Sequence, residues 1–207
     1  MNLPVPVSTL RCLPREFASK NGQPVKVRIL ADEAQRQLLA MYLAFQPRNC
    51  FQGLPPIKDE VCTKWVREML GTGINLVAAA RDVPIVGHAA LFPINPRKCE
   101  MLVVICPGFQ NIGIGTELVR ACIDLAAELN FERIWLPVDA TNVRARHVYK
   151  KCGFQYVSSK QGHELDMACE VREHNRQHNE AGRIAPHIPV PCFQLHAGAP
   201  TQLEGVY

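Results

Sequence analysis

Hydrophobic and polar positions along the chain predict alternating strands and helices from about residue 25 onward. The segment VKVRIL (25–30) alternates apolar and basic residues, as a half-buried strand does. Residues 31–45 and 57–73 place apolar side chains at helical spacing, and a loop rich in proline and polar residues (45–56) separates them. The first part of the domain is therefore expected to be one strand followed by two helices.

The rest of the domain adds strands and two further helices. Residues 74–82 and 85–94 are apolar runs joined at Val83 and Pro84, which is typical of an antiparallel hairpin. A strand over 99–106, a helix over 113–129, a strand over 131–138, a helix over 142–152 and strands over 153–159 and 163–171 follow. This order predicts an α/β (α+β) fold with a mixed, mostly antiparallel central sheet of about seven strands, flanked by about four helices.

The two ends of the chain lack such periodicity. Residues 1–24 contain four prolines and are expected to form an irregular extension, with packing on the domain left open. Residues 172–207 are polar and carry histidines without the regular spacing of metal ligands, which favours a tail. The expected organisation is an extension (1–24), one domain (25–171) and a tail (172–207).

Composition narrows the class of protein. The chain has 207 residues, of which 47% are hydrophobic and 20% charged, as in an ordinary globular domain. No apolar run approaches the roughly 20 residues of a membrane span, so a cytoplasmic protein without membrane contact is expected. The net charge of +4 and the lack of long basic runs speak against nucleic-acid binding. Nine cysteines without a CxxC pair predict neither a metal site nor a disulfide framework.

Residues 106–118, CPGFQNIGIGTEL, mark a turn between a predicted strand and a predicted helix. The first amides of a helix lack intrahelical partners and carry partial positive charge, so they attract phosphate. Gly113 and Gly115 keep side chains away from those amides, although a tight packing turn explains two glycines equally well. Leu118 stands where a dinucleotide-binding GxGxxG motif needs its last glycine, and the GK[ST] of a nucleotide-triphosphate loop is absent.

Two motifs lie on either side of the helix predicted over 113–129 and the strand predicted over 131–138. The first is QNIGIG (110–115), with Glu100 seven residues before the strand-ending Pro107. The second is NVRARHVYKKCGF (142–154). Together they resemble the Gcn5-related N-acetyltransferase (GNAT) superfamily, because the first is similar to its Q/R-x-x-G-x-G/A signature and the second to its pattern N-x-x-A-x-x-x-Y-x-x-x-G-F. The resemblance covers roughly residues 25–171 and implies the GNAT fold, with acetyl-coenzyme A as cosubstrate and no metal.

The resemblance also implies where the cosubstrate binds. In this family two strands splay apart and the pantetheine arm pairs with the backbone of one of them, while the glycine loop holds the pyrophosphate. Arg120, one turn into the helix, and Asn142, which also suits a helix cap, are further candidates near the cosubstrate. The expected binding residues are Val103, Val104, Ile105, Gln110, Asn111, Ile112, Gly113, Ile114, Gly115, Thr116 and Asn142.

Two residues stand at the family's catalytic positions. Glu100 is the expected base that takes a proton from the amine, and Tyr149 is the expected acid that protonates the departing thiolate. His88 is a reserve base, though a lone strand histidine is more often structural. Cys152 raises the alternative of an acyl-cysteine, but no paired histidine is evident, so direct transfer is expected.

The implied activity is acetyl transfer from acetyl-coenzyme A to a primary amine, on either a small molecule or a protein lysine. Acceptor contacts are expected from the first two helices, their loop and the last strands, where Asp59, Glu60, Glu164 and Asp166 could attract a cation. The alternative is a non-catalytic acyl-coenzyme A binding module on the same fold. A homodimer is compatible with either reading.

Overall fold

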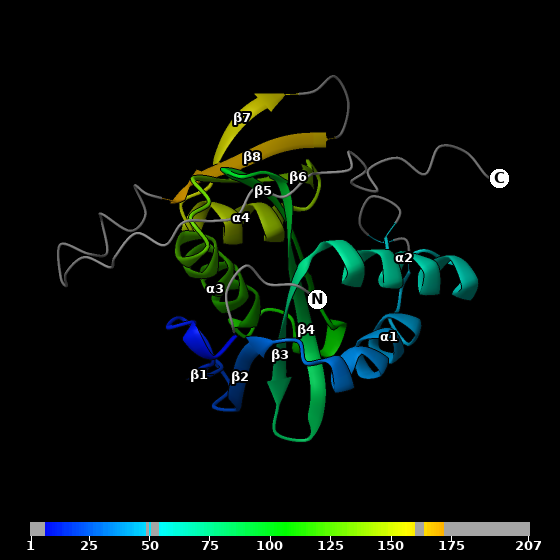
Figure 1. Ribbon diagram of the computed structural model, residues 1–207. Coiled ribbons are helices and arrows are strands. Elements are labelled where there is room, and N and C mark those ends of the chain that lie inside the picture. Colours follow the sequence, from blue (N-terminus) through cyan, green and yellow to red (C-terminus); the bar gives the residue numbers. More distant parts are fainter. Residues whose placement is uncertain (1–6, 49, 51–53, 160–163, 172–207) are drawn as a thin grey trace.

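An eight-stranded sheet forms the centre of the molecule in the computed structural model, which describes residues 7–48, 50, 54–159 and 164–171. Its strand order is β1-β2-β3-β4-β5-β6-β8-β7, and all neighbours are antiparallel except β5 and β6 (Figure 1). The strands are β1 (Arg15–Ala18), β2 (Pro24–Ile29), β3 (Ile74–Ala80), β4 (Val83–Asn95), β5 (Lys98–Ile105), β6 (Arg133–Asp139), β7 (Gln155–Ser159) and β8 (Glu164–Glu170). The mixed, mostly antiparallel sheet expected from the sequence is confirmed.

Four α-helices of the described chain cover the two faces of this sheet, α1 (Gln35–Leu43), α2 (Asp59–Thr72), α3 (Ile114–Glu128) and α4 (Val143–Lys151). Figure 1 shows α3 and α4 on one side of the sheet and α1 and α2 on the other. Each pair of helices closes its own hydrophobic cluster against the strands. None of these helices, in the part of the chain that is described, is long and apolar enough to cross a membrane.

The N-terminal segment differs from its predicted irregular form. Arg15–Ala18 forms strand β1, which pairs antiparallel with β2 and adds one strand to the seven expected. Leu10 and Leu13 are buried in the α3-side cluster. The short strand escaped the sequence pattern because its four residues alternate between half-buried and exposed and include two charges. The predicted tail, 172–207, lies outside the described residues.

The hairpin of β3 and β4 is confirmed, with its turn two residues earlier than predicted. Arg81 and Asp82 form the turn, and Val83 already pairs with Ala80. Pro84 lies near the start of β4, a position where a missing amide donor is tolerated. Strand β4 pairs with β5 from Lys98 to Ile105, the whole length of β5.

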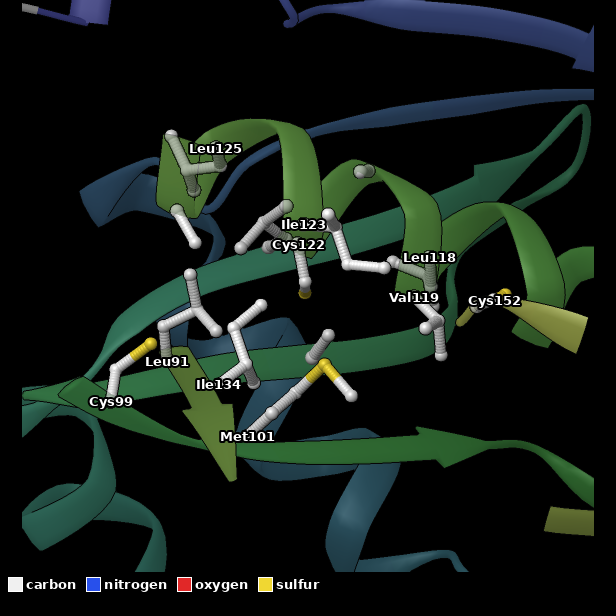
Figure 2. Packing of buried hydrophobic residues seen from close by; sticks show 14 of the residues in the cluster. Leu91, Cys99, Met101, Leu118, Val119, Cys122, Ile123, Leu125, Ile134 and Cys152 are labelled. Atoms are coloured by element: carbon white, nitrogen blue, oxygen red, sulfur yellow. The ribbon is translucent and has the colours of Figure 1, made fainter. Parts of the chain in front are cut away.

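Helix α3 is held to the sheet by a continuous apolar stripe. Figure 2 shows Leu118 and Cys122 of α3 directed toward the strands that carry Met101 and Ile134. These side chains are all at most 3% exposed, and burying each large aliphatic side chain contributes about 1.5–3 kcal/mol. The start of α3 is consequently placed rigidly beside the end of β5, where the predicted phosphate-binding loop lies.

Candidate active site

A split in the sheet lies between β5 and β6. The two strands pair in parallel at three positions only, Lys98 with Arg133, Cys99 with Ile134 and Glu100 with Trp135. Beyond Glu100, β5 continues to Ile105 along β4, whereas β6 continues to Asp139 along β8. The divergence of two strands implied by the family resemblance is thus confirmed.

Alternation along β5 shows that the split connects the two faces of the sheet. Met101, Val103 and Ile105 pack into the cluster beneath α3, and Leu102 and Val104 pack into the cluster beneath α1 and α2. The main chain between these side chains borders the split. An extended ligand can pair with such a strand edge as an added strand would, while the apolar side chains remain in the core.

The loop after β5 turns sharply toward α3. The Cys106 amide donates to the Val86 carbonyl at 3.0 Å, and a 3-10 turn follows over Pro107–Phe109. The Gln110 side-chain amide donates back to the Ile105 carbonyl at 3.1 Å. Asn111 (φ 65°) and Gly113 (φ 97°) both adopt left-handed backbone conformations. At position 113 any residue other than glycine would strain the main chain.

The reversal exposes the first amides of α3 at the end of this loop. The Glu117 amide donates to the Gly113 carbonyl at 3.2 Å, so the amides of Gly113, Ile114, Gly115 and Thr116 have no intrahelical acceptor. They point out of the positive end of the helix dipole. The Ile114 side chain is 1% exposed and packs in the core, so only its main chain is available to a ligand.

A cleft of about 1940 Å³ runs along the split and over this loop. It brings together nearly all residues that the sequence proposed for the site; the exception is Ile114, whose side chain lies in the core. The cleft is lined by the proposed residues Glu100, Val103, Val104, Ile105, Gln110, Asn111, Ile112, Gly113, Gly115, Thr116, Asn142 and Tyr149.

Basic residues line the cleft from the side of α3 and α4. Lys20 comes from the turn between β1 and β2, Arg120 from α3, and Arg144 and Lys151 from α4. Arg120 pairs with Glu117 at 2.6 Å, one turn apart on the same helix, so its charge is partly balanced. The predicted role of Arg120 in phosphate binding stays a prediction.

Carboxylates line the cleft from the opposite face. Strand alternation places Glu100 and Asp139 on the α1 and α2 face, because their neighbours Met101 and Val138 pack beneath α3. Leu165 of β8 packs in the α3-side cluster, so its neighbour Glu164 lies on the α1 and α2 face together with Glu100 and Asp139. Glu68 reaches the cleft from α2. The cleft is therefore basic on one face of the sheet and acidic on the other.

Tyr149 lies in the cleft wall on the α3 and α4 side. It is 9% exposed and its ring centroid is 5.7 Å from that of Phe154. Burial raises the pKa of its phenol well above the ordinary value, and the nearby Cys122 and Cys152 add to this. Tyr149 therefore keeps its proton at physiological pH and can donate it or a hydrogen bond.

Cys152 does not have the surroundings of a nucleophile. Its thiol is buried, lies outside the lining of the cleft, and contacts the Thr116 carbonyl at 3.8 Å. Burial raises the pKa of the thiol to about 11, which leaves little thiolate at neutral pH. The geometry gives no support to an acyl-cysteine route.

His88, the reserve base, lies in the core beneath α1 and α2. Its Nδ1 is 2.7 Å from the Tyr42 hydroxyl and its Nε2 is 3.0 Å from Asn75 Oδ1. The Asn75 amide nitrogen donates to the Gly73 carbonyl, so Asn75 Oδ1 accepts a hydrogen bond from His88 Nε2. The Tyr42 hydroxyl then donates to His88 Nδ1. Burial lowers the pKa of His88 to about 3. Its burial and its two hydrogen bonds favour a structural role for His88 and give no support to its use as a base.

Asn142 caps α4, as one of its two predicted roles required. Its side-chain oxygen accepts a hydrogen bond from the Ala145 amide at 3.1 Å. The residue also lines the cleft, so its side-chain NH₂ remains available there. A contact between Asn142 and the cosubstrate stays a prediction.

The four carboxylates proposed for acceptor binding are placed in three different ways. Glu164 lines the cleft, whereas Asp166 is buried beside it on β8. Asp59 pairs with Arg48 at 2.6 Å, and with Glu60 it lines a smaller pocket on the outer side of α2. Of the two proposed acceptor segments, Asn49, residues 51–53 and residues 160–163 lie outside the described residues.

Several cleft residues were missed by sequence reasoning. Trp65 lies within the helix predicted over 57–73 and Trp135 within the strand predicted over 131–138, and an aromatic residue in such an element is typical of core packing. Glu68 and Asp139 are single charges at element surfaces, a common pattern without a ligand. Lys20 lies in the segment predicted to be irregular. Their place in the cleft lining depends on strand pairing and helix packing, which leave no signal in the local sequence.

Comparison with known proteins agrees with this arrangement. The model of the acetyltransferase (GNAT) family matches residues 40–154, more than half of the chain. The chain therefore belongs to the GNAT acetyltransferase family, as its two motifs indicated. The solved structure of the GNAT domain of S. lividans PAT shares the fold with a TM-score of 0.66, at 13% sequence identity over 76% of this chain and 96% of that one.

Individual relatives are similar over shorter segments. The mycothiol acetyltransferase of Propionibacterium freudenreichii is 32% identical over 91 residues, which are 44% of this chain and 29% of that protein. The spermidine N(1)-acetyltransferase of Escherichia coli is 34% identical over 59 residues, 28% of this chain and 32% of that protein. The matches thus span about a third of the length of these relatives.

Proposed function

We propose that this protein transfers the acetyl group of acetyl-coenzyme A directly to a primary amine. The observation that carries the proposal is the division of the cleft by the split sheet. A row of helix amides and basic side chains lies on one face, and carboxylates lie on the other. A polyanionic cosubstrate and a cationic amine thus have separate entrances that meet at the split.

The binding of the cosubstrate follows from the main chain. The amides of residues 113–116 donate to the pyrophosphate, and the edge of β5 at Val103, Val104 and Ile105 pairs with the pantetheine arm. The thioester supplies an activated carbonyl group. With the arm in the split, this carbonyl lies near the point where Glu100 and Trp135 form the last pair of the two strands.

The two proton transfers of the reaction are assigned to residues on opposite faces of the sheet. Glu100 faces the acidic side and takes a proton from the incoming ammonium, directly or through water, so that the nitrogen lone pair attacks the carbonyl carbon. A main-chain amide near Val103 donates to the carbonyl oxygen as it gains negative charge. Tyr149, on the coenzyme side, gives its proton to the sulfur as the carbon–sulfur bond breaks. The nitrogen, positively charged after its attack, loses its second proton to water, and the tyrosinate takes a proton back from water, which leaves the neutral amide and the free thiol.

The acceptor is proposed to be cationic, either a small amine or a protein lysine. Glu68, Glu100, Asp139 and Glu164 together attract a positive compound, and the indole rings of Trp65 and Trp135 can cover its methylene groups. The name of one relative, a spermidine acetyltransferase, supports an acceptor with several charges. The cytoplasmic location and the homodimer stay predictions.

A screen of acceptors with acetyl-coenzyme A tests the proposal. Released thiol is measured with polyamines, monoamines, amino acids and lysine-containing peptides, and acetylated products are identified by mass spectrometry. We expect turnover with at least one primary amine and none with its N-acetylated form. Tight binding of acetyl-coenzyme A, with thiol release at background for the whole panel, would favour the alternative of a non-catalytic binding module.

A further inference from the structure

The N-terminal segment lies along α3 and is attached near both ends of that helix. The main-chain amides of Arg11 and Cys12 donate to the Glu128 carboxylate at 3.0 and 3.1 Å, and Arg15 pairs with Asp124. At the other end, the Lys20 amide donates to the Ile112 carbonyl at 2.9 Å. The segment therefore reaches from the last turn of α3 to the loop that precedes its first turn.

Lys20 is held in place by a tight turn between β1 and β2. The Ser19 amide and hydroxyl both donate to the Gln23 carbonyl at 2.9 Å, and the hydroxyl is 2.6 Å from Asn21 Oδ1. The Gly22 amide donates to the Ser19 carbonyl at 2.8 Å, with φ 79° at Gly22. These bonds fix the main chain on both sides of Lys20 without using its side chain.

The Lys20 side chain lies over the phosphate-binding loop. Its Cγ is 3.8 Å from the position that a Cβ on Gly113 would occupy, and the residue lines the cleft. No ion pair of Lys20 is found within the described part of the chain, whereas the nearby Arg120 is paired with Glu117. Lys20 thus brings an uncompensated positive charge to the start of α3.

We infer that the Lys20 ammonium binds a phosphate group of coenzyme A at the loop, an inference that rests on the proposed function. The helix amides of residues 113–116 contact one side of the phosphate, and the ammonium adds a mobile point charge from the other. Coenzyme A has two groups that an ammonium could bind in this way, the pyrophosphate and the 3′-phosphate. By this role the N-terminal segment becomes part of the cosubstrate site.

Calorimetric titration of coenzyme A and of dephospho-coenzyme A into matched variants tests the inference. Lys20→Gln should raise the dissociation constant of coenzyme A about fivefold at low salt, and less at high salt. Lys20→Arg should stay within about twofold of wild type, because the charge is kept. Lys26→Gln is the control, since Lys26 lies on β2 of the same hairpin and pairs with Glu16 at 2.9 Å.

Each outcome separates the inference from the proposed function. An equal loss for both ligands would assign Lys20 to the pyrophosphate, and a loss for coenzyme A alone would assign it to the 3′-phosphate. Wild-type affinity in Lys20→Gln, or an equal loss in Lys20→Arg, would overturn the inference while the proposed function stood. A wild-type protein that binds neither ligand would overturn both. Urea unfolding of each variant verifies that the fold is retained.

Discussion

At the scale of single residues, Glu100 and Tyr149 approach the split from opposite faces of the sheet. Glu100 lies on β5 at the last pair with β6, on the face of α1 and α2. Tyr149 lies on α4 within the cluster beneath α3. The proposed reaction needs a base where the amine enters and an acid where the thiolate leaves, and we propose Glu100 for the first role and Tyr149 for the second.

Replacing Glu100 by Gln should lower turnover about 100-fold near pH 7. The deficit should shrink toward high pH, where more of the amine is already deprotonated. The rate at saturating acetyl-coenzyme A, measured from pH 6 to 10, gives this dependence. Glu170→Gln serves as the control, because Glu170 is an exposed carboxylate on β8 that pairs with Arg133 at 3.2 Å. A parallel pair of wild-type and Glu100→Gln profiles would remove Glu100 from the role of base.

Tyr149→Phe removes a single hydroxyl and keeps the buried ring. Because the phenol is expected to act only when the carbon–sulfur bond breaks, kcat should fall, by about 100-fold, with little change in the affinity for acetyl-coenzyme A. Steady-state kinetics and equilibrium titration measure the two quantities separately. Turnover at the wild-type rate would show that the sulfur is protonated by another group.

At the scale of elements, a buried chain of hydrogen bonds joins α1, β4 and β3. Tyr42 on α1 donates to His88 on β4, and His88 donates to Asn75 on β3. Both sides of the imidazole are satisfied only in its neutral form, and the pKa of His88 is lowered to about 3 by burial. The attachment of α1 to the sheet therefore involves a histidine that is neutral in the folded protein.

This histidine should make the protein sensitive to acid. The pKa of His88 is about 6.5 in the unfolded chain and about 3 in the folded protein. At pH values between these two, His88 binds a proton in the unfolded chain but not in the folded one. The free energy of unfolding should therefore fall as the pH falls, with a His88 contribution of up to about 1.4 kcal/mol per pH unit between pH 6 and 4.

Urea unfolding from pH 4 to 7 measures this contribution. His88→Gln should be less stable than wild type at pH 7, by about 1–3 kcal/mol for the disturbed hydrogen bonds, and its stability should depend less on pH. His147→Gln is the matched control, because His147 is exposed on α4. Identical pH slopes in wild type and His88→Gln would contradict the assignment.

At the scale of the whole molecule, the sheet separates two charge environments that meet in one cleft. The proposed function assigns the phosphate groups of coenzyme A to the face of α3 and α4, with Lys20, Arg120, Arg144 and Lys151, and a cationic acceptor to the face of α1 and α2, with Glu68, Glu100, Asp139 and Glu164. The mild net charge of +4 conceals this division, because both kinds of charge are present in similar numbers. Substrate choice should therefore follow local charges rather than the total.

Charge removal on the acceptor face should change acceptor binding alone. Glu68→Gln and Glu164→Gln should each raise the KM for a cationic acceptor by up to about fivefold, and the effect should weaken in high salt. The dissociation constant of coenzyme A should stay unchanged. Glu60→Gln provides the control on the same helix as Glu68, since Glu60 lies outside the cleft. An equal change in coenzyme A affinity would contradict the separation of the two faces.

The sequence by itself determined the order of strands and helices in the domain and the motifs around Gln110 and Tyr149. Those features depend on the spacing of apolar residues and on turn chemistry, which act over a few residues and are therefore visible locally. The GNAT resemblance, now supported by the family match, also implied the divergence of β5 and β6.

Only the tertiary structure decided which residues share a face of the cleft and which are withdrawn from it. His88 was a plausible base along the chain, but packing buries its side chain in the core, and the side chain of Ile114 is likewise buried, so that only its main-chain amide faces the loop. Lys20 reaches the loop before α3 through a hydrogen bond to Ile112, a residue far away in sequence. Such contacts arise from long-range strand pairing and helix docking, so no local pattern of residues could have revealed them.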